Sequence, residues 1–310
     1  MTLSKYQIFS AIIKAGSLTK AAEELHLTQS GVSYAISTLE QDLGFPLLKR
    51  DRSGIHLTTN GSRVLSHIEK VLHEENLLEQ EAAAIRGVNI GSVRIGSISS
   101  VSMNWLPGVL IKFSQQFPNI DVSTRMACYD EITGWLNNNI VDIGFMSIPV
   151  SKPFEALPLK KDNLYVVLPP KHPLRNRKLI SLTELVDEPF IMPLWGNDDN
   201  IRHMLLRYKA VPKNIKYEIM EEQTILALVA QSVGITILPG LILNHVPDNV
   251  HVIELKEKES RTLGLVAITL KNASPANVNF ICCLLSYLRE RGQLDFETEA
   301  ALMEKYWRKR

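Results

Sequence analysis

The sequence predicts an α/β protein that opens with a helix-turn-helix and a long helix. Two short helices joined by a tight turn fit residues 1–61, and basic residues follow the second helix. Over residues 62–86, apolar side chains recur at alternating spacings of four and three. From residue 91 onward, short apolar strands alternate with helical segments, which is typical of sheets covered by helices.

The helix-turn-helix is defined by its caps and by its apolar spacing. Ser17 can start the first helix, and His26-Leu27 forms the turn. Thr28 is a good N-cap for the second helix, and Gly44 ends that helix. One face of the second helix is apolar and is expected to pack into the domain; it consists of Val32, Ile36, Leu39 and Leu43.

The opposite face and the segment after the helix carry polar and basic side chains. Side chains of this kind can reach phosphates and base edges in the major groove, and the basic segment beside the turn at 53–54 resembles a wing. A three-helix domain with solvated polar faces is the alternative, because periodicity reports burial and not the ligand. The candidate DNA-binding residues are Thr28, Gln29, Ser30, Ser33, Tyr34, Ser37, Lys49, Arg50 and Arg52.

Residues 62–86 offer a way to form a dimer. Their apolar spacing is that of an a/d seam with one polar intrusion, and no helix breaker occurs before Gly87. A long helix packed on its own domain is the alternative, because three heptads are few for a coiled coil. The seam consists of Val64, Ile68, Val71, Glu75, Leu78, Ala82 and Ile85.

The alternation after residue 91 predicts parallel sheets with helices between their strands. Strands are expected over 92–97, 120–125, 142–146, 164–168, 190–192 and 235–238. Helices are expected up to residue 117 after the segment 99–102, and over 130–136, 198–208, 224–231 and 280–288.

Composition and charge restrict the class of protein. The chain has 310 residues and a net charge of +1, with 45% apolar and 22% charged residues. Because the charge is balanced, DNA affinity must come from the local placement of basic residues and from more than one DNA-binding unit. We expect no membrane partner and a cytoplasmic location, because there is neither an 18-residue apolar run nor a signal-peptide core. Three cysteines without Cys-x-x-Cys spacing favour a reducing compartment and argue against structural zinc.

The N-terminal segment resembles the winged helix-turn-helix of LysR-type transcriptional regulators. The resemblance implies a DNA-binding domain over 1–61 and a linker helix over 62–90 that pairs two subunits. Two positions depart from the family pattern: Leu48 replaces a usual Phe, and Tyr34 replaces a basic or long polar residue, which affects the base preference. The matching residues include Ala15-Gly16-Ser17-Leu18-Thr19-Lys20-Ala21-Ala22, Gln29-Ser30-Gly31-Val32-Ser33, Leu43-Gly44, Lys49-Arg50 and Leu57-Thr58.

Residues 91–295 resemble the effector-binding domain of the same family. The resemblance implies two α/β subdomains like those of a periplasmic binding protein, 91–161 with 267–295 and 162–266, joined by crossovers near 161–162 and 266–267. Ser232 stands where the family usually has Gly, and the tail 296–310 is either an amphipathic helix or partly ordered. The matching residues include Val93-Arg94-Ile95-Gly96, Leu106-Pro107, Phe117-Pro118, Asp142-Ile143-Gly144, His172-Pro173-Leu174, Val233-Gly234-Ile235 and Leu238-Pro239.

Polar residues at strand ends define a candidate effector site. In such sheets ligands bind beyond the carboxyl ends of the strands, where hydroxyl and free N–H groups can hold an anion or a polar small molecule. Each of these residues taken alone could merely cap a helix. The candidate effector-binding residues are Ser99, Ser100, Ser147, Trp195, Asn197, Gln223 and Thr224.

Together these features predict a LysR-type regulator that binds double-stranded DNA as a homodimer or homotetramer. A small effector, an anion among the candidates, would control it, and RNA polymerase is a possible further partner. No catalytic, metal or cofactor motif is present, so we expect neither an enzyme nor a cofactor. The alternatives are a small-molecule-binding or transport protein and a redox sensor using Cys128, whereas Cys282-Cys283 fits core packing.

Overall fold

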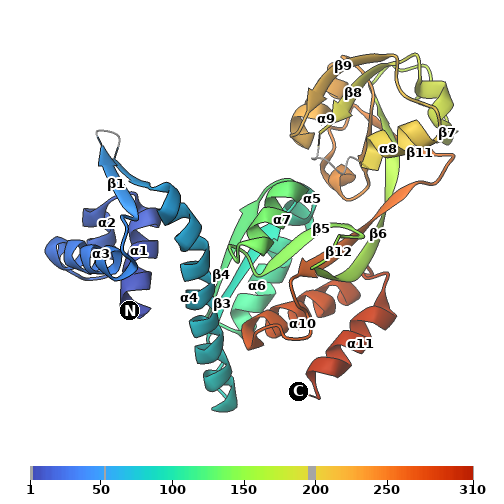
Figure 1. The fold of residues 1–310 in the computed structure, drawn as a ribbon. Helices are drawn as coiled ribbons and strands as arrows, with labels where there is room; N and C mark the ends of the chain where they lie inside the picture. The colour runs from blue at the N-terminus through green and yellow to red at the C-terminus, as the bar shows by residue number, and fades with distance from the viewer. Residues whose placement is uncertain (1–2, 52–53, 195–199, 310) are drawn as a thin grey trace. The chain divides into compact units, whose positions relative to one another are not determined.

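The computed structural model describes residues 3–51, 54–194 and 200–309. The chain divides into two compact units, Met1–Val88 and Asn89–Arg310 (Figure 1). Each unit has its own hydrophobic core. The division falls inside the expected linker, 62–90.

The first unit contains the expected helix-turn-helix and wing. The wing is an antiparallel hairpin that pairs Leu48 with Leu57. The predicted apolar face of the second helix is buried at Val32, Ile36 and Leu39. The elements of this unit are α1 (Leu3–Ala15), α2 (Leu18–Glu24), α3 (Gln29–Leu43), β1 (Leu48–Asp51), β2 (Gly54–Leu57) and α4 (Thr59–Ile85).

Caps fix both ends of α3, as the sequence predicts. The hydroxyl of Thr28 accepts a hydrogen bond from the amide of Gly31 at 3.1 Å. At the other end Gly44 has φ +81°, a left-handed conformation that glycine adopts without strain. The carboxylate of Glu40 accepts from the amides of Leu47 and Leu48 at 2.7 and 3.1 Å, which attaches the wing to α3.

The wing meets α4 at a point where only glycine fits. Thr58 caps α4 by accepting from the amide of Gly61 at 2.9 Å. A Cβ atom at Gly61 would lie 2.1 Å from the carbonyl oxygen of Leu47. Backbone contact this close fixes where α4 starts relative to the wing.

Helix α4 exposes only part of the expected seam. Ile68 is 4% exposed and belongs to the core of the first unit, so it is not available to a partner subunit. Val71, Leu78 and Ile85 are 44, 71 and 82% exposed. These three are seven residues apart and therefore form one stripe along the helix.

The second unit is built on a mixed sheet, not on the purely parallel sheets that the alternation predicts. Its order is β4-β3-β5-β12-β6-β11-β7, with β10 also paired to β6. β3 is parallel to β4 and β5, whereas β12 runs antiparallel to both β5 and β6. The strands are β3 (Gly91–Ser97), β4 (Ile120–Met126), β5 (Ile143–Ile148), β6 (Glu155–Leu168), β7 (Leu179–Ile180), β10 (Thr236–Pro239), β11 (His251–Leu255) and β12 (Ser260–Ala267). A separate parallel pair comprises β8 (Pro189–Pro193) and β9 (Asn214–Ile219).

Strands β6 and β12 connect two subdomains. The first half of β6 pairs with β12, and its second half pairs with β10 and β11. Residues 262–266 of β12 already pair with β5, so this strand crosses before residue 262, earlier than the expected 266–267. The expected crossing at 161–162 lies within β6.

Helices pack against these strands. Where one helix was expected to run to residue 117, there are two, because Pro107 has no N–H to continue the helical ladder. The α-helices are α5 (Ser99–Asn104), α6 (Leu106–Gln116), α7 (Tyr129–Asn137), α8 (Asn200–Arg207), α9 (Glu222–Ala230), α10 (Pro275–Glu290) and α11 (Glu297–Trp307). Short 3-10 helices are η1 (Leu182–Leu185) and η2 (Ile242–His245).

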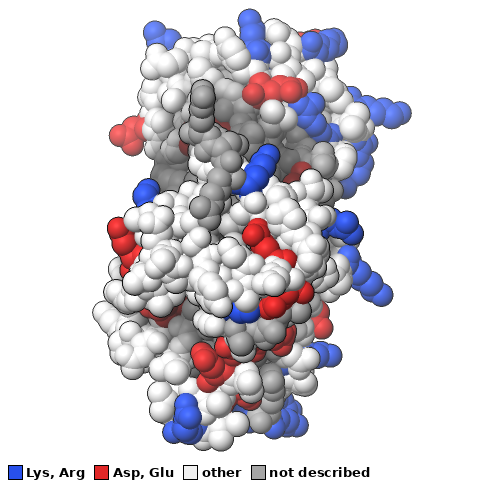
Figure 2. Space-filling view, turned by 60° about the vertical axis from the view of Figure 1, so that its left-hand side comes forward, with Lys and Arg blue, Asp and Glu red and all other residues white. Residues whose placement is uncertain are grey.

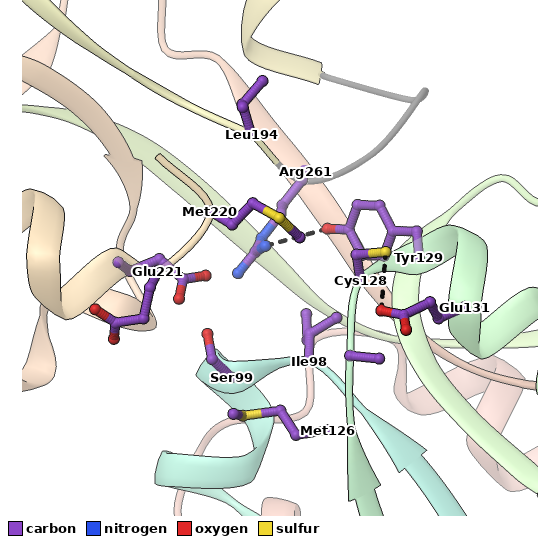
Figure 3. Close-up of a pocket in the computed structure, with 12 residues that line it drawn as sticks. Ile98, Ser99, Met126, Cys128, Tyr129, Glu131, Leu194, Met220, Glu221 and Arg261 are labelled. Atoms are coloured by element: carbon purple, nitrogen blue, oxygen red, sulfur yellow. Dashed lines mark hydrogen bonds between the residues drawn. The ribbon is translucent and has the colours of Figure 1, made fainter. Parts of the chain in front are cut away.

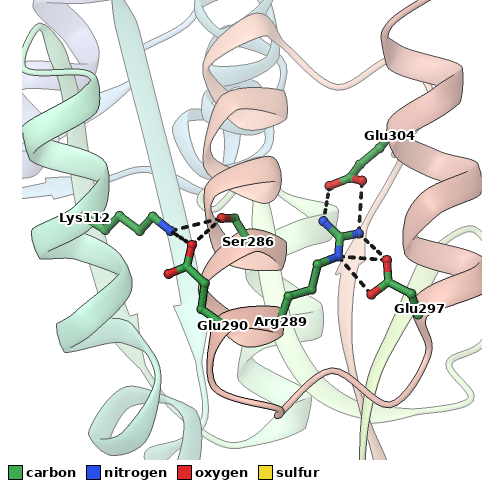
Figure 4. Close-up of polar contacts among 6 residues, drawn as sticks. All are labelled: Lys112, Ser286, Arg289, Glu290, Glu297 and Glu304. Carbon is green, nitrogen blue, oxygen red and sulfur yellow. Dashed lines mark hydrogen bonds and ion pairs between the residues drawn. The ribbon is translucent and has the colours of Figure 1, made fainter.

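The C-terminal tail is a helix that packs on the second unit. α11 contacts β6 and α10, and the indole N–H of Trp307 donates to the carbonyl of Leu270 at 2.9 Å. Arg289 of α10 holds the carboxylates of Glu297 and Glu304 of α11 at 2.8 Å (Figure 4). Of the two alternatives for the tail, the structure shows the helix.

Candidate DNA-binding face and effector cleft

The predicted DNA-binding residues lie on α3, at its N-cap and in the wing. Six of the predicted residues are exposed, and Ser33 is half-buried. Arg52 and the side chain of Arg50 lie outside the described part of the structure. The six exposed residues are Thr28, Gln29, Ser30, Tyr34, Ser37 and Lys49.

The exposure of Tyr34 is hard to explain by folding alone. Its side chain is 75% exposed in the middle of α3, although its aromatic ring would gain from burial. An exposed aromatic residue with a hydroxyl can stack on, or hydrogen-bond to, a nucleic acid. By contrast, the hydroxyl groups of Thr28 and Ser30 lie within hydrogen-bond distance of each other, 3.2 Å, at the N-terminal cap of α3.

Charge on the surface is mixed. Figure 2 shows basic and acidic side chains interspersed with uncharged surface on the face drawn, in keeping with the net charge of +1. The face drawn therefore carries no extended field of one sign.

The second unit contains a cavity between its two subdomains. Ile98, Ser99 and Met126 lie on one side of it, and Met220 and Glu221 lie on the other (Figure 3). Among the described residues the cavity has a volume of about 210 Å³. The other lining residues are Ala127, Cys128, Tyr129, Glu131, Leu194, Glu222 and Arg261.

A buried ion pair forms the floor of this region. Arg261 of β12 and Asp162 of β6 lie opposite each other in the strand pairing, and their side chains are 4 and 3% exposed. The guanidinium donates to Asp162 at 2.9 and 3.0 Å, to the hydroxyl of Ser100 at 3.0 Å and to that of Tyr129 at 3.3 Å. Asp162 also accepts from the amide of Leu241 at 2.9 Å. The pair thus connects both subdomains at the strands that join them.

The protonation of Arg261 follows from these partners. Burial alone would lower the pKa of Arg261, but Tyr129 and Asp162 raise it above its ordinary value. The guanidinium therefore stays charged, and the carboxylate of Asp162 balances that charge locally.

The structure brings only some of the predicted effector residues together. Ser99 lines the cavity, whereas Ser100 lies behind it, 2% exposed, and accepts from Arg261. Ser147 lies on β5 opposite Leu263 and is not among the lining residues. Trp195 and Asn197 lie outside the described residues.

Gln223 and Thr224 take part in the N-terminal cap of α9. Their backbone amides donate to the carboxylate of Glu221 at 3.1 and 2.6 Å, and the hydroxyl of Thr224 donates to it at 2.5 Å. Burial alone would raise the pKa of Glu221, but these hydrogen bonds outweigh burial and lower it. Neither Gln223 nor Thr224 is among the cavity-lining residues.

Sequence reasoning missed Arg261, Asp162 and Tyr129. No local signal singles them out, because Asp162 directly follows Lys160 and Lys161 in β6 and Arg261 lies between Ser260 and Thr262 in β12. Their pairing depends on the register of two strands that are 99 residues apart, which no local pattern shows.

Among the described residues, no helix is long and apolar enough to span a membrane. Within the same residues, no group of three or more His, Cys, Asp or Glu side chains is placed to hold a metal ion.

The chain resembles solved structures of similar size. Full-length OxyR C199D from Pseudomonas aeruginosa superposes with a TM-score of 0.74 at 22% identity, covering 93% of this chain and 95% of that one. Full-length CbnR complexed with its target DNA superposes with a TM-score of 0.67 at 21% identity, covering 93% and 100%. At these identities the likeness shows the shared fold.

Sequence relatives give the family. The HTH-type transcriptional regulator YvbU of Bacillus subtilis (strain 168) is 32% identical over 284 residues, 91% of this chain and 97% of that protein. The HTH-type transcriptional activator CmpR of Synechocystis sp. is 32% identical over 239 residues, 76% and 78% of the two chains. Residues 3–62 match "Bacterial regulatory helix-turn-helix protein, lysR family", and residues 86–289 match "LysR substrate binding domain". With both parts matched and the fold shared, the chain belongs to the LysR family of DNA-binding transcriptional regulators.

Proposed function

We propose that this regulator contacts DNA through the exposed face of α3 and the β1–β2 wing, acts as a homodimer or homotetramer, and responds to a small effector in the cavity. The observation that supports DNA contact best is the two-sided character of α3. Its apolar side is buried, and its exposed side carries Gln29, Tyr34 and small hydroxyl residues. An amide side chain such as that of Gln29 can read an adenine edge with two hydrogen bonds, whereas Lys49 can contact phosphate.

Two substitutions separate these roles. Lys49→Ala should weaken binding to all duplexes several-fold and reduce the slope of log K against log salt by about 0.9 for each phosphate that is no longer neutralised. Gln29→Ala should change the preference among sequences instead. Lys70→Ala is the matched control, because Lys70 is an exposed lysine on α4, outside the helix-turn-helix and wing. Fluorescence anisotropy with the DNA upstream of the gene and with shuffled DNA measures both effects; equal loss on both DNAs for Gln29→Ala refutes base reading.

The exposed stripe on α4 supports pairing of subunits. Val71, Leu78 and Ile85 repeat every seven residues, which is the spacing of one seam position of a helix pair, and they are 44, 71 and 82% exposed. Two DNA-binding units would also compensate for the weak charge of each.

The cavity supports control by a small molecule more than control by thiol chemistry. A reactive thiolate is stabilised by positive neighbours, but the thiol of Cys128 donates to the carboxylate of Glu131 at 3.4 Å. Burial raises the pKa of Cys282 to about 11 and also raises that of Cys283, so both stay protonated at neutral pH. Operator binding that changes with peroxide and recovers with dithiothreitol, without any metabolite, would favour the redox alternative.

A further inference from the structure

We propose that the C-terminal segment clamps the hinge between the two subdomains of the second unit and restricts their relative movement. This segment, the tail clamp, runs from Asp295 through α11 to Trp307. It lies beyond the part of the chain that matches the LysR substrate binding domain, which ends at residue 289. The proposal concerns the movement of the subdomains, so it holds whatever ligand the cavity binds.

The tail clamp is bonded to β6 where this strand leaves the first subdomain. The backbone amide of Lys161 donates to the carboxylate of Asp295 at 2.8 Å. The amide of Asp295 donates to the carbonyl of Leu159, also at 2.8 Å. The residue after Lys161 is Asp162, which forms the buried ion pair with Arg261. The clamp therefore holds the hinge strand directly beside its ion pair.

The same edge of β6 continues into the second subdomain. Alternate residues of a strand direct their backbone groups to one edge, so Lys161 and Asn163 face the same way. The carbonyl of Asn163 accepts from the amide of Gly240 at 2.8 Å, and β10 pairs with β6 from residue 164 onward. The next amide, that of Leu241, donates to Asp162 at 2.9 Å. The tail clamp and the second subdomain are thus bonded to consecutive stretches of one strand edge.

The far end of the tail clamp is fixed to the first subdomain. Ala300 and Trp307 are buried, and Trp307 donates to the carbonyl of Leu270. The amide of Leu270 donates in turn to the carboxylate of Glu155, the first residue of β6, at 2.7 Å. Arg289 adds two ion pairs between α10 and α11 (Figure 4).

These attachments make the tail clamp a bias on the hinge. Its bonds reach β6 near both ends of the half that belongs to the first subdomain. A rotation at the crossing would break the bonds of Asp295, so the clamp favours the arrangement in which they form. A ligand that prefers another arrangement has to overcome this bias by its differential affinity.

Hydrogen exchange of the full-length protein tests whether the clamp acts across the hinge. Asp295→Ala removes the acceptor of Lys161 and should speed exchange of that amide roughly threefold, the scale of one exposed hydrogen bond. Exchange should also rise, by roughly twofold, at the amides of Gly240 and Leu241, whose own acceptors lie on β6 and are unchanged. Mass spectrometry of peptides covering 158–164 and 238–244 measures the two sides of the hinge separately.

Two further variants separate control of the hinge from a local loss. Asp295→Asn keeps an oxygen acceptor and should lie between Asp295→Ala and the wild type in both peptides. Asp121→Ala, the control, removes an exposed carboxylate from β4 at the opposite edge of the sheet and should change neither. Faster exchange confined to 158–164, or no change there, overturns the clamp. Exchange that rises equally throughout the second unit, with a lower melting temperature, would mean general loosening and also overturns it.

Discussion

Replacing Arg261 with Met tests how the two subdomains of the second unit are held at their connecting strands. The substitution keeps most of the apolar stem but removes the donors to Asp162, Ser100 and Tyr129. Because Asp162 is 3% exposed, its carboxylate would be left buried without its counter-charge. Breaking a buried pair in this way costs about 3–5 kcal/mol.

The size of the second unit converts this cost into a melting shift. For a unit of this length each kcal/mol lowers Tm by about 2–4 °C, so Arg261→Met should lower the transition by roughly 6–20 °C. Differential scanning calorimetry of the full-length protein measures this shift. Arg207→Met is the control, because Arg207 is 63% exposed and its ion pair with Glu259 should contribute only about 0–1 kcal/mol.

The double variant decides whether the loss comes from unpaired charge. Asp162→Asn keeps a carbonyl oxygen to accept from the amide of Leu241, and Asp162→Asn/Arg261→Met leaves no buried charge at this site. The double variant should therefore be more stable than Arg261→Met alone, within about 2 kcal/mol of the wild type. The reasoning would be refuted if the stability losses of the two single variants simply added in the double variant. It would also be refuted if Arg207→Met were as destabilising as Arg261→Met.

Substitutions at four further positions, one of them with a matched control, test other parts of the structure. Leu78→Glu should shift sedimentation toward smaller species and weaken operator binding at least tenfold, whereas Leu302→Glu, at a similarly exposed leucine on α11, should do neither. Ser232→Gly should raise the melting temperature by a few degrees, about 1 kcal/mol, because Ser232 has φ +62°; an unchanged or lower value contradicts this strain. Trp307→Phe should cost about 1 kcal/mol through the lost indole hydrogen bond, and Trp307→Ala about 3–5 kcal/mol in thermal unfolding; equal losses would deny the hydrogen bond a role. Gly61→Ala should destabilise the first unit by about 1–3 kcal/mol in chemical denaturation, because its Cβ would meet backbone; wild-type stability would show that the wing can shift freely.

The N-terminal elements could be predicted from sequence because their signals are local. Thr28 and Gly44 mark the ends of α3 through capping and backbone preference, both of which act within one helical turn. The departure at Ser232 also has a local meaning, since the family's usual Gly suits the left-handed backbone found there. Strands β3, β4, β5, β8 and β10 and the second half of β6 were predicted for the same reason, but β7, β9, β11 and β12 were missed.

The seam and the effector site show where local pattern fails. Ile68 and Leu78 have the same apolar character and spacing, but one is buried in its own unit and the other is exposed. Thr224 follows the strand-end rule for a ligand contact, yet its hydroxyl and amide bond to Glu221. A spacing identifies a face of a helix, and only packing shows what covers that face.

The sequence by itself determined the family, the helix-turn-helix with its polar face, and the alternation of strands and helices. These features depend on caps, periodicity and motifs that act over a few residues. Only the tertiary structure decided that β6 and β12 run antiparallel and place Asp162 against Arg261. It also decided that the carboxylate of Glu221 caps the N-terminus of α9 beside the cavity. The physical reason is that strand register and the charge of a cleft arise from residues far apart in the chain, which approach one another only when the whole core is packed.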